Sequence, residues 1–456
     1  MEEKAQFHFG MAGPWITIIF LLAGMIASTI LHKGMAGLLI VCFTALFIGF
    51  LLAKDKKNFG KITITGLQNS ILGTITVAFL FAGILAQLMR QSGLIDARIY
   101  GITSIGFSAG FVPAAAFIIC MIISTACGTS TGSVAAVAPV LVPVAHGLGI
   151  DLGLICGAIV SGAIFGDNLA PISDTTIASA LTQEAKINDV VRTRLPYSLI
   201  SAAVSLVLFI FIGQSMAAGT HPDIASKTIV MQSYVLLLLP FIMVFMMRKG
   251  WDIMATLLIC DIAGVIINLC LGCISPAVMF SGKGPVVSGM MGMMVLLVYV
   301  ILLFMILQIM KASGAFEQLG TSMMKWCKSY RSGELVVFAN AAIGSIITGG
   351  SSPSIIFFGP FVRQITKELG IDRCRGANIL DGTACGITGL MPHGNPNLVS
   401  IGVVMAIPGV DPSFSFLNIL PYNYHCWGLL IIFLLSIMTG IGRRFEKPVL
   451  EEGQER

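Results

Sequence analysis

Apolar runs long enough to cross a membrane follow one another along almost the whole chain, separated by short polar connections. A helix needs about 20 mostly apolar residues to cross a bilayer, because each residue advances it by only about 1.5 Å. Such runs fall at about 12–31, 35–53, 66–90, 109–127, 131–148, 152–182, 196–213, 229–247, 252–272, 291–311, 334–348, 352–369, 376–405 and 420–440. The pattern predicts an all-α polytopic membrane protein with about 14 helical segments.

The sixth run contains two carboxylates and a proline, which an ordinary spanning helix avoids. Residues 166–176 read GDNLAPISDTT, so Asp167 and Asp174 flank Pro171. A charge at the bilayer centre costs roughly 2.5–3.5 kcal/mol on the lowest scales. Proline breaks the helix and frees backbone groups that need partners. Residues 387–397 interrupt the thirteenth run similarly, with two prolines and two glycines. We therefore expect broken helices that build an ion site.

Composition excludes a soluble protein, since hydrophobic residues make up 56% of the chain, charged residues 11%, and the mean hydropathy is +0.92. The net charge of +5 lies in the connections, so it indicates topology and not nucleic-acid binding. The first apolar run continues at spanning length, so no cleavable signal peptide is expected. Cys270 and Cys273 are the only closely spaced cysteine pair, and no second pair or histidine-rich partner accompanies them, so a metal site is not favoured. The histidines show no metal-ligand spacing, and no phosphate loop is visible. We therefore predict that the protein is not an enzyme and that it needs no cofactor.

The two halves match at a constant offset of 221 residues. Most runs of the first half fall on runs of the second, and 11 of 49 positions are identical between 128–176 and 349–397. Residues 1–220 form the first predicted repeat and residues 221–456 the second, within one membrane domain. Seven segments per repeat are an odd number, so the second copy must enter from the opposite side. Inverted repeats with broken helices are typical of secondary transporters.

Positive charge sets the predicted orientation. Lysines and arginines gather after the second, sixth, eighth, tenth and last runs. With 14 spans, all of these clusters fall on one side, which the positive-inside rule identifies as the cytoplasm. Both termini are therefore predicted to be cytoplasmic, in a multi-pass protein of the cell's inner membrane.

Asp167 and Asp174 are the best candidates for ion binding. A buried carboxylate can hold a proton or a metal ion, and competition for one site is the simplest antiport mechanism. The alternative for Asp174 is that it caps a helix beginning at Thr175. The predicted cation- and proton-binding residues are Asp167, Asp174, Asn168, Ser173, Thr175, Thr176 and Asp381, with Asp167 and Asp174 as transient Na⁺ ligands.

Further polar residues lie at the ends and inside of other runs. Candidates for a substrate site are Ser130, Thr131, Ser351, Ser352, Asp261, His393 and Asn395. Three candidates from the two sets also have structural interpretations: Asp381 as a residue near the cytoplasmic mouth, Asp261 as a residue paired within the scaffold, and His393 as a hydrogen-bonded structural residue. The central parts of the spans are interpreted as holding four aspartates and no Lys or Arg, a balance that favours a cation.

Residues 166–176 resemble the GD-x-x-SP-x-SDTT signature of the NhaC-type Na⁺/H⁺ antiporters of the ion transporter superfamily. The segment Asp381-Gly382-Thr383, followed by Leu390-Met391-Pro392, is similar to that family's second motif region. The resemblance covers nearly the whole chain. Ala170 replaces the usual serine, His393 replaces the usual tryptophan, and Leu380 stands where an acidic residue is often found. The family also has members that exchange organic acids or move amino acids.

These observations together predict a secondary transporter that exchanges Na⁺ for H⁺ through buried carboxylates. The alternative is a cation-coupled carrier of an organic acid or amino acid, whose carboxylate would bind at the serine-rich helix N-termini. A channel and a membrane enzyme are less favoured. The predicted partners are Na⁺ and H⁺, with Li⁺ or a small organic acid or amino acid as alternatives, the lipid bilayer, and a second copy of the chain in a homodimer.

Overall fold

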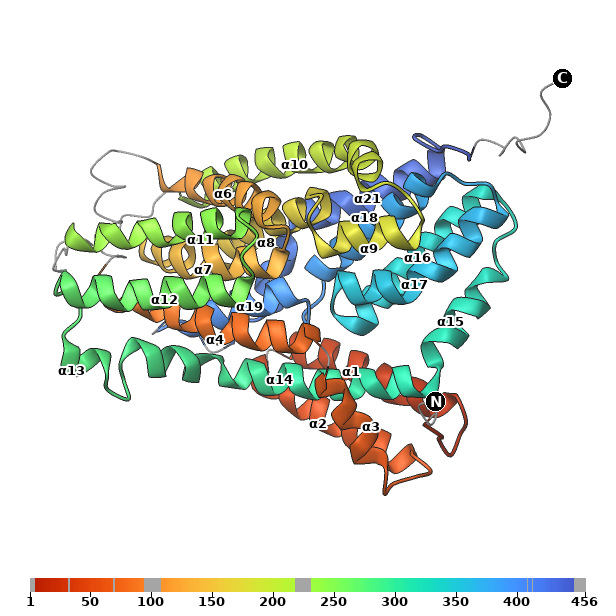
Figure 1. Cartoon of the computed structure of the whole chain (residues 1–456), viewed down its shortest axis with the longest axis horizontal. Coiled ribbons are helices and arrows are strands. Elements are labelled where there is room, and N and C mark those ends of the chain that lie inside the picture. Colours follow the sequence, from red (N-terminus) through yellow and green to blue (C-terminus); the bar gives the residue numbers. More distant parts are fainter. Residues whose placement is uncertain are drawn as a thin grey trace.

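The computed structural model describes residues 5–31, 33–68, 70–93, 108–217, 231–407, 409–411 and 413–446. Within these ranges the secondary structure is helical, with isolated bridges between Phe7 and Ala53 and between Ile371 and Phe445. Most of the long helices lie roughly along the long axis of the molecule (Figure 1). The prediction of an all-α polytopic membrane protein is confirmed.

Each predicted apolar run coincides with a helix or a pair of helices. The long or paired helices of the first half are α1 (Ala12–Ile30), α2 (Gly34–Leu52), η1–α4 (Gly66–Gln68 and Ser70–Gln91), η2–α6 (Ala109–Phe111 and Val112–Cys127), α7 (Ser130–Gly147), α8 (Leu152–Leu169), α9 (Asp174–Thr182) and α10 (Ile187–Ala217). Those of the second half are η3–α11 (Met231–Leu237 and Leu238–Arg248), α12 (Ile253–Cys270), α14 (Pro285–Ser313), α16 (Tyr330–Thr348), α17 (Ser351–Glu368), α18 (Arg373–Gly389), α19 (Asn395–Met405) and α20–η4–α21 (Phe416–Ile419, Leu420–Tyr422 and Tyr424–Thr439).

Three further helices lie in the predicted connections: α3 (Phe59–Thr65), α13 (Pro276–Met279) and α15 (Ala315–Met324). By length and composition alone, 6 described stretches can cross a membrane, or 7 if the bent pair Phe416–Tyr422 and Tyr424–Thr439 is one span. Residues 152–182 form one of these stretches even though their helix is broken. The other apolar helices are shorter or bear more polar residues.

Two tight helical hairpins have the same construction. Gly128 ends α6 with φ 68°, and Gly349 ends α16 with φ 67°, so both occupy the left-handed region that favours glycine. A β-carbon on Gly128 would lie 3.0 Å from the backbone nitrogen of Ser173. A β-carbon on Gly349 would lie 2.9 Å from the carbonyl oxygen of His393. The absence of a side chain therefore lets each hairpin tip press against a helix break.

The two breaks follow from matching local sequences. Asp151 and Asp372 cap the N-termini of α8 and α18 by accepting hydrogen bonds from the backbone N–H groups of Leu154 and Arg375. The chain then leaves the helix at residues 170–173 in the first case and 390–394 in the second, and resumes as α9 and α19. The prolines in and after these segments explain why neither helix continues.

The broken helices lie in the middle of the molecule, enclosed by the others (Figure 1). Helix α8 contacts α6 and α7, and α18 contacts α16, α17 and α21. The helices around α8 and those around α18 are in contact, because α9 packs on α17 and α18, while α10 packs on both α8 and α18. Residues 153–169 are buried along their whole length, which fits a helix surrounded by protein and not by lipid. Both breaks are therefore held between layers of helices.

Candidate functional site

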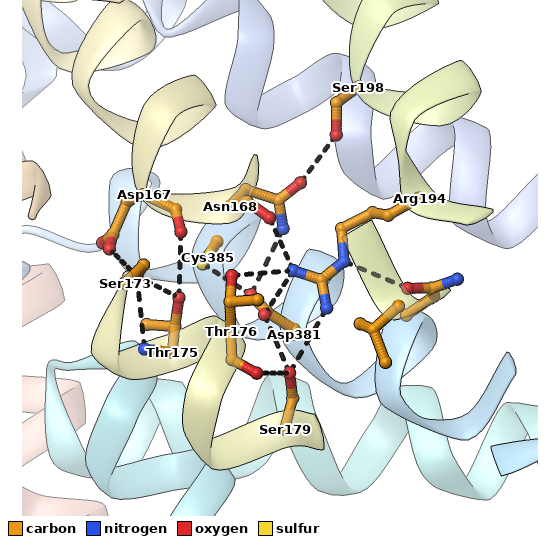
Figure 2. Close-up of polar contacts among 12 residues, drawn as sticks. Asp167, Asn168, Ser173, Thr175, Thr176, Ser179, Arg194, Ser198, Asp381 and Cys385 are labelled. Carbon is orange, nitrogen blue, oxygen red and sulfur yellow. Dashed lines mark hydrogen bonds and ion pairs between the residues drawn. The ribbon is translucent and has the colours of Figure 1, made fainter. Parts of the chain in front are cut away.

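Asp167 lies in the last turn of α8 and is only 3% exposed. Ser130, in the first turn of α7, donates a hydrogen bond to its Oδ2 at 2.6 Å. Ser173, in the break, donates to its Oδ1 at 2.6 Å (Figure 2). Among the described residues, no lysine or arginine forms an ion pair with Asp167. The negative charge of this carboxylate is thus offset by neutral hydroxyl groups only.

More oxygen atoms surround the same carboxylate. The Oγ atoms of Ser173 and Thr175 are 2.9 Å apart, and Thr175 donates to the main-chain oxygen of Asp167 at 3.1 Å. We call Ser130, Asp167, Ser173 and Thr175 the Asp167 cluster. Carboxylate, hydroxyl and carbonyl oxygens suit hard cations. In the described part of the chain, no group of 3 or more His, Cys, Asp or Glu residues could hold a metal. The cluster contains one carboxylate, so it offers a single negative charge together with hydroxyl and carbonyl oxygen atoms.

Asp174 is the first residue of α9 and is exposed. Its carboxylate accepts a short hydrogen bond from the Ser352 hydroxyl, in the first turn of α17. The alternative interpretation, that Asp174 caps a helix starting at Thr175, is wrong, because Ser173 is the N-cap and accepts from the Thr175 N–H at 3.3 Å. Asp174 is instead exposed beside the break, and its hydrogen bond with Ser352 connects the break to the tip of the hairpin between α16 and α17.

Asp381 lies in the middle of α18 and is fully buried. It forms an ion pair with the guanidinium of Arg194, which is also fully buried. Asn168 donates to its Oδ1 at 3.2 Å, and Ser179 donates to its Oδ2 at 3.0 Å (Figure 2). Cys385, one turn further along α18, lies 3.1 Å from Oδ1 through its sulfur. Asp381 therefore differs from Asp167 in having a fixed positive partner.

The interpretation that the central parts of the spans hold no lysine or arginine is wrong. Arg194 was expected to follow the sixth run on a cytoplasmic connection, but α10 begins at Ile187, well before the apolar run at 196–213. The guanidinium donates to the main-chain oxygen of Asn168 at 2.5 Å, to the Asn378 Oδ1 at 3.1 Å and to the Ser179 Oγ at 3.2 Å. The one available signal was the buried aspartate itself, since a buried charge needs a partner.

Asn168, next to Asp167 at the end of α8, connects this end of the helix to Asp381 and Arg194. Its amide donates to Asp381, its Oδ1 accepts from Ser198 at 2.7 Å, and its main-chain oxygen accepts from Arg194. Thr176 also lies 3.4 Å from Arg194 through its hydroxyl. We call these residues the Asp381 cluster; they are Asn168, Thr176, Ser179, Arg194, Ser198 and Asp381. The structure thus brings all seven predicted cation- and proton-site residues to one break, in two clusters and with exposed Asp174 beside them.

The second break carries no carboxylate. His393 is 2% exposed and its Nε2 lies 2.7 Å from the Ile346 oxygen; since a carbonyl only accepts, Nε2 donates. Asn397 donates to the main-chain oxygens of Gly389 and Met391, at 2.9 and 3.0 Å. Asn423 donates to Gly389 as well, at 2.5 Å. Sequence analysis did not identify these two asparagines, which donate hydrogen bonds to backbone carbonyl groups that the break frees.

The remaining substrate-site candidates lie at the hairpin tips, at the end of the second break and on a distant helix. Thr131 and Ser351 lie in the first turns of α7 and α17, and Asn395 opens α19. Asp261 lies on α12, which packs mainly on α4 and α11. It is 4% exposed, and neither carboxylate oxygen has a hydrogen-bond partner in the described part of the protein. The structure therefore does not bring Asp261 to either cluster.

Comparison with known proteins gives consistent matches. Residues 6–214, which contain the first break, match the model of the Na⁺/H⁺ antiporter family. The arginine/ornithine antiporter ArcD of Halobacterium salinarum is 26% identical over 417 residues, covering 86% of this chain and 84% of that protein. A malate-2H⁺/Na⁺-lactate antiporter of Bacillus subtilis is 31% identical over 183 residues, 40% of this chain and 38% of its own. The Na⁺/H⁺ antiporter NhaC of Alkalihalophilus pseudofirmus is 25% identical over 272 residues, 58% of each chain.

Proposed function

We propose that this chain belongs to the Na⁺/H⁺ antiporter family, that it is therefore a multi-pass secondary antiporter and not an enzyme, and that it exchanges Na⁺ for H⁺. The observation that carries the proposal is the environment of Asp167. This carboxylate is buried, held by two serine hydroxyls, and has no cationic side chain paired with it in the described part of the chain. An unpaired buried carboxylate is costly unless a proton or a cation neutralises it.

The exchange follows from this requirement. When Asp167 is ionised, Na⁺ can bind its carboxylate together with the hydroxyl oxygens of Ser130, Ser173 and Thr175. When Asp167 is protonated, the charge that attracts Na⁺ is gone. One negative charge therefore admits one of the two ions at a time, which is the basis of antiport. Asp174, exposed next to the break, would pass ions between solvent and Asp167.

Symmetry supports an alternating-access mechanism. Helices α6 to α9 and α16 to α19 occur in the same order, with caps and left-handed glycines 221 residues apart. We propose that residues 1–220 and 221–456 are inverted repeats, so that movement of one bundle against the other opens the break to alternate sides. The boundary between them lies outside the described residues. We also propose that the protein lies in the inner membrane, that both of its termini are cytoplasmic, and that it forms a homodimer.

The inverted arrangement predicts that His146 and Lys367 lie on opposite sides of the membrane. Both are exposed, in the last turns of α7 and α17, and they are 221 residues apart. In a background without reactive thiols, we expect His146→Cys to react with an impermeant thiol reagent from outside and Lys367→Cys from the cytoplasm. Both substitutions leave the Asp151 and Asp372 caps intact. Reaction of both cysteines from one side would contradict the inversion.

Transport by the purified protein in proteoliposomes tests the function. A proton gradient is imposed and Na⁺, Li⁺ or K⁺ is added, followed by lactate, malate, arginine and ornithine in separate experiments. We expect Na⁺ alone to dissipate the gradient, and protein-free liposomes to show only slow leakage. If none of the cations moves protons, Na⁺/H⁺ exchange is not the function.

Arg194 favours a second candidate, a cation-coupled carrier of an organic acid or amino acid. A buried guanidinium can bind a carboxylate through two parallel hydrogen bonds. In this mechanism the substrate carboxylate would take the place of Asp381 beside Arg194 while a cation neutralises Asp381. The two relatives named for arginine/ornithine and malate/lactate exchange agree with such a substrate class. Gradient dissipation that requires one of the organic substrates would favour this candidate.

A further inference from the structure

A cleft opens between α10, α18 and the segment that follows α21. It consists of two adjoining cavities of about 290 and 530 Å³. Both cavities are lined by Thr193, Pro196, Asp372, Cys374 and Arg444, so they form one continuous space. We call it the α10–α18 cleft. Neither the Asp167 cluster nor the exposed Asp174 lines it.

The floor of the cleft is one side chain away from the buried ion pair. Cys374, Asn378 and Asp381 are spaced i, i+4 and i+7 on α18, so they lie on one face of the helix. Cys374 and Asn378 line the cleft, and Asp381 lies beyond them. The Asn378 Oδ1 accepts from the Nε of Arg194 at 3.1 Å, and its amide donates to Thr193 at 2.8 Å. Asn378 thus separates the cleft from the Arg194–Asp381 pair.

The walls of the cleft are held more firmly than its floor. Arg375 is fixed by Glu334 at 2.8 Å and by Ser436 at 2.7 Å. Asn378 is held by one bond between neutral groups and by one from Arg194, which has other acceptors. Bonds between neutral groups are weaker than charge-assisted ones, and only Arg375 has a carboxylate partner, so Asn378 is held less strongly than Arg375.

The mouth of the cleft is polar and carries charges of both signs. It is lined by the exposed side chains of Asp189, Arg192 and Arg444, together with Asp372. Two positive and two negative residues give a rim with no net charge, which repels neither a proton carrier nor a hydrated cation. Water, and not lipid, is the expected filling of such a mouth.

We propose that the α10–α18 cleft is the aqueous route by which the exchanged ions reach the Arg194–Asp381 pair, and that Asn378 is the positioning residue that closes it. The inference rests on the proposed function, because it assigns an entrance to the transporter. From the pair, Asn168 leads on to the end of α8 and Asp167. The cleft lies apart from the exposed Asp174, which does not line it.

Two native cysteines test this route from either side of Asn378. Cys374 lines the cleft, whereas Cys385 is fully buried beside Asp381. We use variants in which Cys374 or Cys385 is the single remaining cysteine. We expect a charged, membrane-impermeant thiol reagent to modify Cys374 and to leave Cys385 unmodified. Asn378→Ala should then make Cys385 react about tenfold faster or more, because the floor loses its two hydrogen bonds. The matched control is Asn268→Ala, a buried asparagine on α12, which should leave Cys385 unchanged.

Three results would overturn the inference: no reaction of Cys374 with the charged reagent, reaction only with lipid-soluble reagents, or an unchanged rate at Cys385 in Asn378→Ala. The first two would identify a closed or lipid-filled groove. The labelling is independent of transport. Absence of transport by the wild-type protein would therefore count against the proposed function, whereas these labelling results count against the cleft alone.

Discussion

Asp167→Asn is expected to abolish Na⁺/H⁺ exchange and leave a folded protein. The asparagine keeps the shape of the side chain, and its amide can still pair with the hydroxyls of Ser130 and Ser173, which are able to accept as well as donate. It can neither carry the negative charge that attracts Na⁺ nor bind the exchanged proton. Exchange should fall to the level of protein-free liposomes, as measured by the decay of an imposed proton gradient on addition of Na⁺.

The matched control is Asp151→Asn, on the same helix. Asp151 caps the N-terminus of α8 by accepting from the Leu154 N–H at 2.8 Å, and asparagine is an equally good cap. This variant loses a carboxylate but keeps its structural role, so exchange should continue. Size-exclusion chromatography of both variants checks that each is folded. Exchange by Asp167→Asn at the wild-type rate would remove Asp167 from the mechanism and, with it, the main support for the proposed function.

The membrane helices and both breaks could be predicted from sequence because the causes are local. Spanning length depends on hydropathy, and the interruptions at 170–173 and 390–394 follow from Pro171 and from Pro392 and Pro396. The same local reasoning identified the aspartates around the first break. The alternative interpretation of Asp174 as an N-cap was off by one residue, since Ser173 and Asp174 are both residue types that cap well; Ser173 is the N-cap, and Asp174 accepts a hydrogen bond from Ser352.

The partner of each aspartate could not be predicted, because partners are distant in sequence. Arg194 and Asp381 are 187 residues apart, and their contact exists only because α10 packs on α18. Arg194 also lies outside the apolar run, so hydropathy assigned it to a connection. The first turns of α10, residues 187–196, contain several polar and charged residues, so hydropathy does not assign them to a spanning helix. Tertiary packing nevertheless buries one side of these turns. This single difference changes the charge balance of the site and restores the organic-acid alternative.

Arg194→Gln is expected to destabilise the protein by about 3–5 kcal/mol, because Asp381 would keep a buried charge without its partner. The double variant Arg194→Gln/Asp381→Asn should recover most of this loss, since both groups become neutral and Asn168 and Ser179 still supply hydrogen-bond partners. Thermal unfolding of the detergent-solubilised proteins measures both effects. Arg373→Gln is the matched control: the Arg373 side chain is 43% exposed and pairs with Glu446 and Glu184, which are 27% and 60% exposed, and exposed pairs are worth only about 0–1 kcal/mol.

Transport by the double variant then separates the two candidate functions. If Asp167 alone carries the exchanged ions, the double variant should still exchange Na⁺ for H⁺, because the Asp167 cluster is unchanged. If Arg194 binds a substrate carboxylate, uptake of that organic acid or amino acid should disappear while the protein stays folded. A double variant that is no more stable than Arg194→Gln would show that the buried pair does not act as a unit. Loss of Na⁺/H⁺ exchange in a stable double variant would instead place Asp381 within the ion pathway itself.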